Sequence, residues 1–180
     1  MGFSFITIFL VLDSNRKAFQ EKVSSKLNQN PGQVAQQSPQ AMQMMESVQK
    51  AKAALDQDPE NYELNIQMAN NYFDIGRFEQ AISHYKTALK KNSSDPNVLI
   101  DLGVSFFNTS NPDSALKYMK AALKVNPVHP QGLYNIGIVY FSKGDSSSAI
   151  DQWQKLISTN QNTPQAQTAQ KFLDQLKNKL

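Results

Sequence analysis

Few residues in this chain have side chains that could take part in chemistry. His84 and His129 lie far apart in the sequence, and neither has a partner at the spacing of a metal-binding or acid–base pair. The acids Asp56, Asp58 and Glu60 cluster near a predicted turn, but calcium requires a fixed ligand loop, so solvated carboxylates are expected. No phosphate-binding glycine loop, nucleophile elbow or zinc-protease motif occurs. The sequence therefore predicts a protein that is not an enzyme and that holds no metal and no cofactor.

Composition excludes further classes of function. The chain has no cysteine, which excludes disulfides, a thiolate nucleophile and a cysteine-type zinc site. Its 18 basic and 15 acidic residues leave a net charge of only +3. Because no stripe of lysine and arginine interleaved with aromatic residues occurs, nucleic acid is not expected as a partner. Asparagine and glutamine are frequent, so the surface is polar with little charge.

The elements that must position any functional side chain follow a repeat of 34 residues. Ala81, Ala115 and Ala149 are separated by this step. The same step connects four further series: Met68, Leu102 and Ile136; Tyr72, Phe106 and Tyr140; Gly76, Ser110 and Gly144; and Tyr85, Met119 and Trp153. Small residues at such positions let two helices approach closely, and large apolar residues fill the remaining space. Trp153 and the tyrosines are therefore expected in the core.

This pattern resembles the tetratricopeptide repeat family, whose unit is a helix–turn–helix of 34 residues. The resemblance covers residues 62–95, 96–129 and 130–163. It departs from the family at Ser93 and Gln161, where a proline is usual, and at the early tryptophan position, which holds Asn65, Leu99 and Leu133. The resemblance implies an all-α fold, a right-handed superhelix of three stacked helical hairpins. Stacking is required because one unit cannot bury its apolar face alone.

Three segments are expected along the chain. Residues 1–27 form an apolar N-terminal segment followed by a short helix, and residues 28–40 form a flexible linker with Pro31, Gly32 and Pro39. Residues 41–180 form the repeat domain. A Met-rich helix with Met45, Val48 and Leu55 on one face is expected to cover the first repeat. A helix over residues 164–180 is expected to cover the last one.

Residues 3–12, from Phe3 to Leu12, form the only long apolar run. As a helix the run would span about 15 Å, against roughly 30 Å of hydrocarbon, so it is too short to cross a bilayer. Three interpretations fit: the end of a membrane anchor that begins upstream, an interfacial anchor, or an apolar segment that packs on the array or on another copy. Basic residues follow the run: Arg16, Lys17, Lys22 and Lys26. Association with a membrane is the preferred prediction, and the side of the membrane stays open.

The resemblance also implies a concave groove lined by the first helix of each unit. The family's groove positions fall on Glu63, Ile66, Gln67, Asn70, Phe73, Asp74, Asn97, Ile100, Asp101, Val104, Phe107, Asn108, Gln131, Tyr134, Asn135, Ile138, Phe141 and Ser142. The predicted partner-binding residues are thirteen of these eighteen, all except Glu63, Gln67, Asp74, Gln131 and Ser142. The surface is apolar and aromatic, with amides at intervals and almost no positive charge.

The groove residues indicate what it would bind. Family members that clamp acidic chaperone C-termini carry lysine and arginine here, whereas this chain matches that clamp only at Asn70. An acidic tail is therefore not expected as a partner, and an amphipathic helix or an apolar extended segment is. For Ile66, Ile100 and Tyr134, binding and packing between repeats are both open. Recurring Phe73, Phe107 and Phe141 favour binding.

A narrower resemblance concerns residues 149–157, from Ala149 to Ile157, followed by a capping helix. This segment is similar to repeat proteins that assist cytochrome c maturation in the bacterial cell envelope, which are membrane-anchored and bind apocytochrome chains. The sequence thus predicts a protein-binding scaffold or assembly factor tethered to a membrane. The alternative is a structural protein that self-associates into a homo-oligomer through its N-terminal segment and Met-rich helix.

Overall fold

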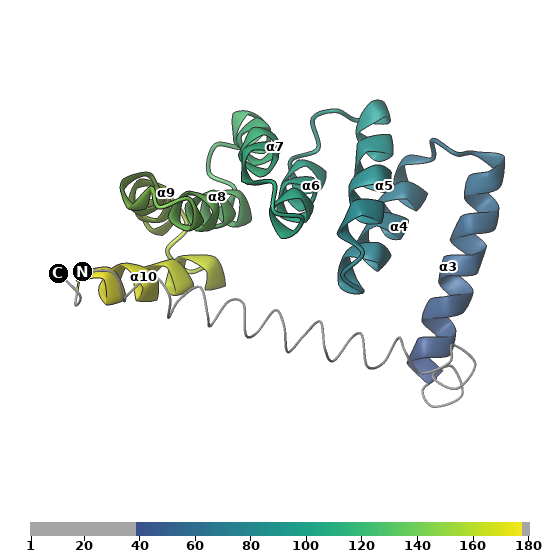
Figure 1. Ribbon diagram of the computed structural model, residues 1–180, viewed down its shortest axis with the longest axis horizontal. Helices are drawn as coiled ribbons and strands as arrows, with labels where there is room; N and C mark the ends of the chain where they lie inside the picture. The colour runs from purple at the N-terminus through teal and green to yellow at the C-terminus, as the bar shows by residue number, and fades with distance from the viewer. Residues whose placement is uncertain (1–38, 178–180) are drawn as a thin grey trace.

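The structure is a computed structural model that describes residues 39–177, with side chains described for residues 46–176. Every regular element within residues 39–177 is a helix, and this range contains no strand. Its helices are α3 (Pro39–Gln57), α4 (Tyr62–Asp74), α5 (Phe78–Lys91), α6 (Pro96–Asn108), α7 (Pro112–Val125), α8 (Pro130–Ser142), α9 (Ser146–Thr159) and α10 (Pro164–Lys177). Figure 1 shows α4 with α5, α6 with α7 and α8 with α9 following one another as hairpins, with α3 and α10 at the two ends. The predicted all-α superhelix is confirmed.

Polar caps fix where the first helix of each hairpin begins. The Asn61 side chain accepts a hydrogen bond from the Leu64 N–H at 3.1 Å, which caps α4. Asp95 does the same for α6, with its Oδ1 2.8 Å from the Asn97 nitrogen. Because a side-chain acceptor satisfies an N–H that has no partner inside the helix, these residues set the helix start.

The turns inside the hairpins share one backbone conformation. Gly76, Ser110 and Gly144, which occupy the same repeat position, have φ angles of 75°, 60° and 83°. Positive φ is natural for glycine and unfavourable for other residues. The second repeat therefore carries a strained serine where the first and third have glycine.

The core is built from small residues facing large ones. Ala69, Tyr85, Met119 and Trp153 are all almost completely buried. A methyl group added to Gly103 would lie 2.6 Å from Met119 Cγ, and one added to Gly137 would lie 2.2 Å from Trp153 Nε1. The small residue at the eighth repeat position therefore sets how closely the two helices of a hairpin pack.

The two ends of the array are covered by single helices. On α3, Ala51 is buried, and Val48 and Leu55 are partly buried. On α10, Ala169 and Leu173 are buried, and the Phe172 ring stacks on Trp153 at a centroid distance of 5.4 Å. The side chains of Met44 and Met45 lie outside the described residues.

The predicted apolar N-terminal segment and most of the predicted linker, residues 1–38, also lie outside the described residues. None of the helices α3 to α10 has both the length and the apolar character that a bilayer span requires.

Candidate partner-binding surface

One side of α4, α6 and α8 faces solvent instead of the second helices. On α4 the residues Glu63, Gln67, Asn70 and Asp74 are exposed, and their spacing of four, three and four residues keeps them on one helical face. Equivalent positions on α6 and α8 are exposed or half-buried. We call this surface the first-helix face; it consists of Glu63, Gln67, Asn70, Asp74, Asn97, Asp101, Val104, Asn108, Gln131, Asn135, Ile138 and Ser142.

The three recurring phenylalanines lie at the border of this face and the core. Phe73, Phe107 and Phe141 are all half-buried. The Phe73 ring meets Phe78 edge-on at 5.3 Å, and the Phe141 ring lies 5.9 Å from Trp153. Phe107 packs against a buried cluster that includes Met119 and Ile136. Each ring is therefore held in place by the core and leaves part of its surface accessible.

Of the three residues that were open between binding and packing, Ile100 belongs to the core. Its side chain is 0% exposed and packs in a cluster with Leu99 and Ala122. A methyl group on Gly132 would lie 3.2 Å from Ile100 Cδ1, so the glycine makes the room that Ile100 fills. Predicting Ile100 as a groove residue was wrong for this reason. Ile66 and Tyr134 are half-buried and keep some accessible surface.

Several amides of the face are already engaged inside the protein. Tyr85 donates its hydroxyl proton to Asn70 Oδ1 at 2.6 Å. Asn97 Oδ1 lies 3.0 Å from His129 Nε2, and Asn108 Nδ2 donates to the Val104 carbonyl at 2.9 Å. Asn135 makes no side-chain hydrogen bond within the part of the chain that the structure describes. The amides thus differ in how readily they could bond a partner's backbone.

Asp101 is the one half-buried acid of the face. Burial raises the pKa of its carboxyl group to about 6, and the negative charge of Asp95 adds to this effect. Within residues 46–176 its carboxylate has neither a hydrogen-bond donor nor an ion-pair partner.

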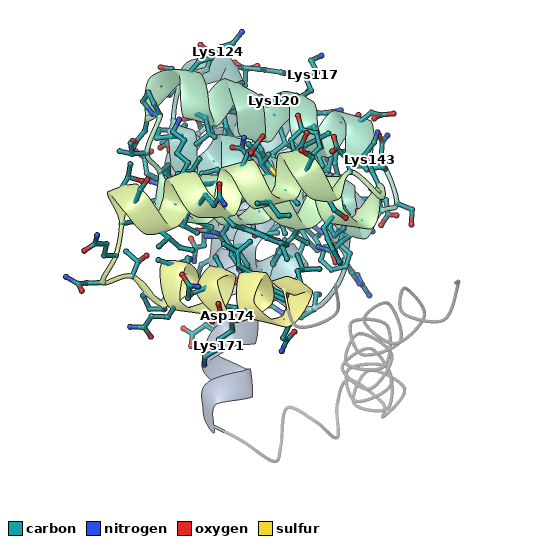
Figure 2. All side chains as sticks on the ribbon, turned by 90° about the vertical axis from the view of Figure 1, so that its left-hand side faces the viewer. Lys117, Lys120, Lys124, Lys143, Lys171 and Asp174 are labelled. Carbon is teal, nitrogen blue, oxygen red and sulfur yellow. The ribbon has the colours of Figure 1, made fainter. Side chains whose placement is uncertain are left out.

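The charges of the array are segregated between first and second helices. Helices α4, α6 and α8 carry no lysine or arginine, whereas α5 and α7 carry several lysines. Figure 2 shows Lys117 and Lys124 of α7 at the upper edge of the molecule. Three lysines lie over aromatic rings: Lys86 over Phe106, Lys120 over Tyr140 and Lys117 over Tyr118.

A polar network that the sequence did not indicate lies under the first hairpin. Asn65 is buried and donates from Nδ2 to the carbonyls of Pro59 and Asn61 at 3.0 and 2.8 Å. Its Oδ1 lies 2.9 Å from His84 Nδ1, and because that oxygen can only accept, His84 carries its proton on Nδ1. Burial lowers the pKa of His84, whose ring stacks on Tyr72. The network is structural. An asparagine in place of the usual tryptophan, paired with a histidine, was the available signal.

Metal-binding chemistry has no counterpart among the described side chains, since no three histidines, aspartates or glutamates gather there. The geometry is that of a helical-repeat scaffold whose first-helix face has no positively charged side chain. Residues 69–110 match the family described as "TPR repeat", and residues 100–166 match "Tetratricopeptide repeat". The chain belongs to the tetratricopeptide repeat family.

Solved structures of such proteins share its fold. A crystal structure of the MamA protein is 23% identical, with a TM-score of 0.66 over 83% of this chain and 79% of that one. A tetratricopeptide repeat protein from Parabacteroides merdae is 18% identical, with a TM-score of 0.67 over 91% of this chain and 60% of that one. The first repeat domain of Spaghetti (RPAP3), solved with the HSP90 peptide SRMEEVD, is 16% identical, with a TM-score of 0.58 over 64% and 91% of the two chains. No curated protein matches the sequence.

Proposed function

We propose that this protein is a non-enzymatic scaffold or assembly factor that holds a segment of a partner protein on its first-helix face. The observation that carries this proposal is the solvent-facing stripe on three successive helices, bordered by half-buried phenylalanines and free of lysine and arginine. The face is rich in amides and carries apolar surface at Val104, Ile138 and the bordering phenylalanines, which suits an amphipathic helix or an extended segment with apolar side chains. The peptide-bound relative supports this use of the fold.

The peptide in that relative ends in acidic residues, and a similar ligand does not suit this chain. Acidic peptides need cations on the binding surface. Here the first-helix face has Asp101 and Asn135 instead, and α4, α6 and α8 supply no cation.

Site-specific photo-crosslinking in cells tests the binding surface. A photoreactive amino acid at Gln67 or Gln131 of the face is expected to give a discrete adduct, whereas one at exposed Gln154 on α9 is the matched control. The adduct should be lost with Val104→Gln, which replaces the methyl groups of a half-buried side chain of the face by an amide. Adducts of equal yield from Gln154, or adducts indifferent to Val104→Gln, would exclude the face as the binding surface.

We also propose that residues 3–12 tether the protein to a membrane, in the bacterial cell envelope. The apolar run and the four basic residues that follow it support this, since a chain of apolar residues flanked by cations suits an anionic lipid surface. The full chain should float with vesicles of phosphatidylglycerol and phosphatidylcholine, and the double variant Ile6→Asp, Ile8→Asp should not. Flotation that this variant retains, with Ser24→Asp as the control, would refute the tether.

Within this proposal, help with cytochrome c maturation is the finer role that the resemblance of residues 149–157 favours. Its test is binding of a haem-free cytochrome c chain to the full-length protein. Self-association through the N-terminal segment and the Met-rich helix is the competing function. Analytical ultracentrifugation of the full chain separates the two, because a monomer that binds a partner segment is incompatible with self-association as the main role.

A further inference from the structure

The Asp101 carboxylate occupies an unusual place on the first-helix face. It lies on α6 one turn after Asn97, and its own backbone carbonyl accepts the Ser105 hydroxyl at 2.8 Å. The Tyr85 hydroxyl donates its proton to Asn70 Oδ1, so this hydroxyl is not available as a donor to Asp101. The nearby charged groups are also acids: the charge of Asp95 acts on Asp101, and the charge of Asp74 acts on neighbouring Tyr85. The carboxylate is therefore half-buried among groups that do not compensate its charge.

Six lysines of the array make contacts elsewhere. Lys90 and Lys91 pair with Glu60 at 3.2 and 3.5 Å, and Lys143 pairs with Asp113. Lys86, Lys117 and Lys120 lie over aromatic rings on the second-helix side. Among the described residues, none of these cations neutralises Asp101.

An unpaired, partly buried charge destabilises a fold, and an asparagine at this position would keep the shape without the charge. Such a residue is typical of sites whose compensation comes from a ligand. Beside Asp101 on α6 and α8 the face continues with Val104, Asn135 and Ile138, which offer apolar contact and one amide without a partner.

We propose that the segment bound on the first-helix face carries a lysine or arginine whose cation pairs with the Asp101 carboxylate, between aliphatic side chains that contact Val104 and Ile138. This inference rests on the proposed function, because it assumes that the face binds a partner segment. Pairing with Asp101 gives the site a charge preference opposite to that of an acidic peptide. It also sets the register of the segment, since one cation must align with one carboxylate.

A peptide library displayed on phage and panned against the full chain provides the test. Enriched peptides are expected to contain one lysine or arginine flanked by aliphatic residues. A fluorescent synthetic peptide of the enriched sequence is then compared with a version in which norleucine replaces its basic residue. On the wild-type protein this replacement should weaken binding about tenfold or more, because it leaves the Asp101 charge unpaired.

The protein variants complete a double-mutant cycle. On Asp101→Asn, the basic peptide should bind weakly and the norleucine replacement should have little further effect. Asp151→Asn, which removes an exposed acid on α9, is the matched control and should behave as wild type.

Each other outcome overturns the inference, and the outcomes are distinguishable. Peptides that lack a basic residue but lose binding with Val104→Gln would refute the Asp101 pairing and leave the proposed function standing. A library without any peptide that depends on Val104 would count against both. A self-associated wild-type chain that dissociates with Asp101→Asn and with Lys120→Gln alike would identify a second copy as the occupant and refute the partner segment.

Discussion

The indole of Trp153 lies directly against the backbone of Gly137: a methyl group on that glycine would come within 2.2 Å of Nε1 and 2.6 Å of Cδ1. The same Nε1 donates a hydrogen bond to the Tyr134 carbonyl at 3.2 Å, which holds the ring in this position. Phe172 of α10 stacks on the ring, at an interplanar angle of 13°. The third hairpin and the terminal helix are therefore built around one contact between a ring and a residue without a side chain.

Gly137→Ala is expected to lower the free energy of unfolding by about 2–3 kcal/mol, since Trp153 is enclosed and cannot move aside. Urea denaturation followed by tryptophan fluorescence measures this loss. Gly132→Ala is the matched control and should cost less, because its methyl group would meet the ends of two aliphatic side chains, Leu123 at 2.8 Å and Ile100 at 3.2 Å, and not an enclosed ring. Equal losses in the two variants would show that the Trp153 contact is not the cause.

Ser110→Gly is expected to stabilise the protein by about 1 kcal/mol, because the serine has a φ of 60° and glycine adopts this conformation without strain. Gly144→Ser makes the reverse change at the equivalent turn and should destabilise by a similar amount. Thermal unfolding of the two variants beside wild type measures both shifts. Shifts of the same sign would contradict the explanation.

Asp101→Asn is expected to raise the free energy of unfolding by roughly 1–2 kcal/mol at pH 7, since the change removes a charge that burial disfavours. A pKa of about 6 in the folded state, against 3.8 ordinarily, means that protonation favours folding. The penalty in wild type is therefore complete above pH 6, fades as the pH falls, and is absent below pH 3.8. Urea titrations at pH 7 and pH 4 should show the gain only at pH 7. A gain of equal size at both pH values would mean that the carboxylate carries no such penalty.

His129→Asn is expected to remove one pH-dependent component of stability. The Gly132 N–H lies 3.4 Å from His129 Nδ1, so the neutral imidazole caps α8, and protonation would remove that acceptor. Burial lowers the pKa of His129, against an opposing effect of Asp95, so the neutral form is favoured in the folded state. The cap is then fully present above about pH 6.5 and its contribution, at most ~1 kcal/mol, is lost as the pH falls below that value.

Asparagine is also a favourable cap and does not titrate, so the His129→Asn variant should match wild type at pH 7.5 and exceed it at pH 5.5 in thermal unfolding. The control is Asp151→Asn, which changes an exposed side chain of α9. His84→Asn is not used as the control, because it would also disrupt the hydrogen bond between His84 and Asn65. No difference between pH 7.5 and pH 5.5 in the relative stability of His129→Asn would refute the role of the cap.

The fold could be predicted because its information is local and periodic. The step from Ala81 to Ala115 to Ala149 marks one repeat position, and in the structure all three alanines are fully buried. Small residues at the eighth position and large ones at the twenty-fourth specify the same helix contact in every hairpin. Such a pattern determines which face of each helix is inside.

The details of the surface depended on neighbours from other repeats. Ile66, Ile100 and Tyr134 share one repeat position, but only Ile100 is buried, because Gly132 of the next repeat leaves room for it. His129 accepts from the Gly132 N–H with one ring nitrogen, and its other ring nitrogen lies 3.0 Å from Asn97 Oδ1, 32 residues earlier, a contact that no local pattern indicates. The isolation of Asp101 likewise depends on which ion pairs the lysines form in three dimensions, and among the described residues none of those ion pairs includes Asp101.

Within residues 46–176, no side-chain hydrogen bond joins hairpins that are not neighbours in the array. Tyr62 donates its hydroxyl proton to Asp95 at 2.5 Å, and Asn160 donates to the Val128 carbonyl at 2.9 Å. Unfolding can therefore proceed from either end without disturbing the hairpins beyond.

Amide protons of α6 and α7, which have a hairpin on each side, should exchange with solvent most slowly, and those of α3 and α10 fastest. Asp101 of α6 is therefore expected to lie in the part of the molecule that unfolds least often. A bound segment would contact a folded surface there even while the two ends of the array unfold locally.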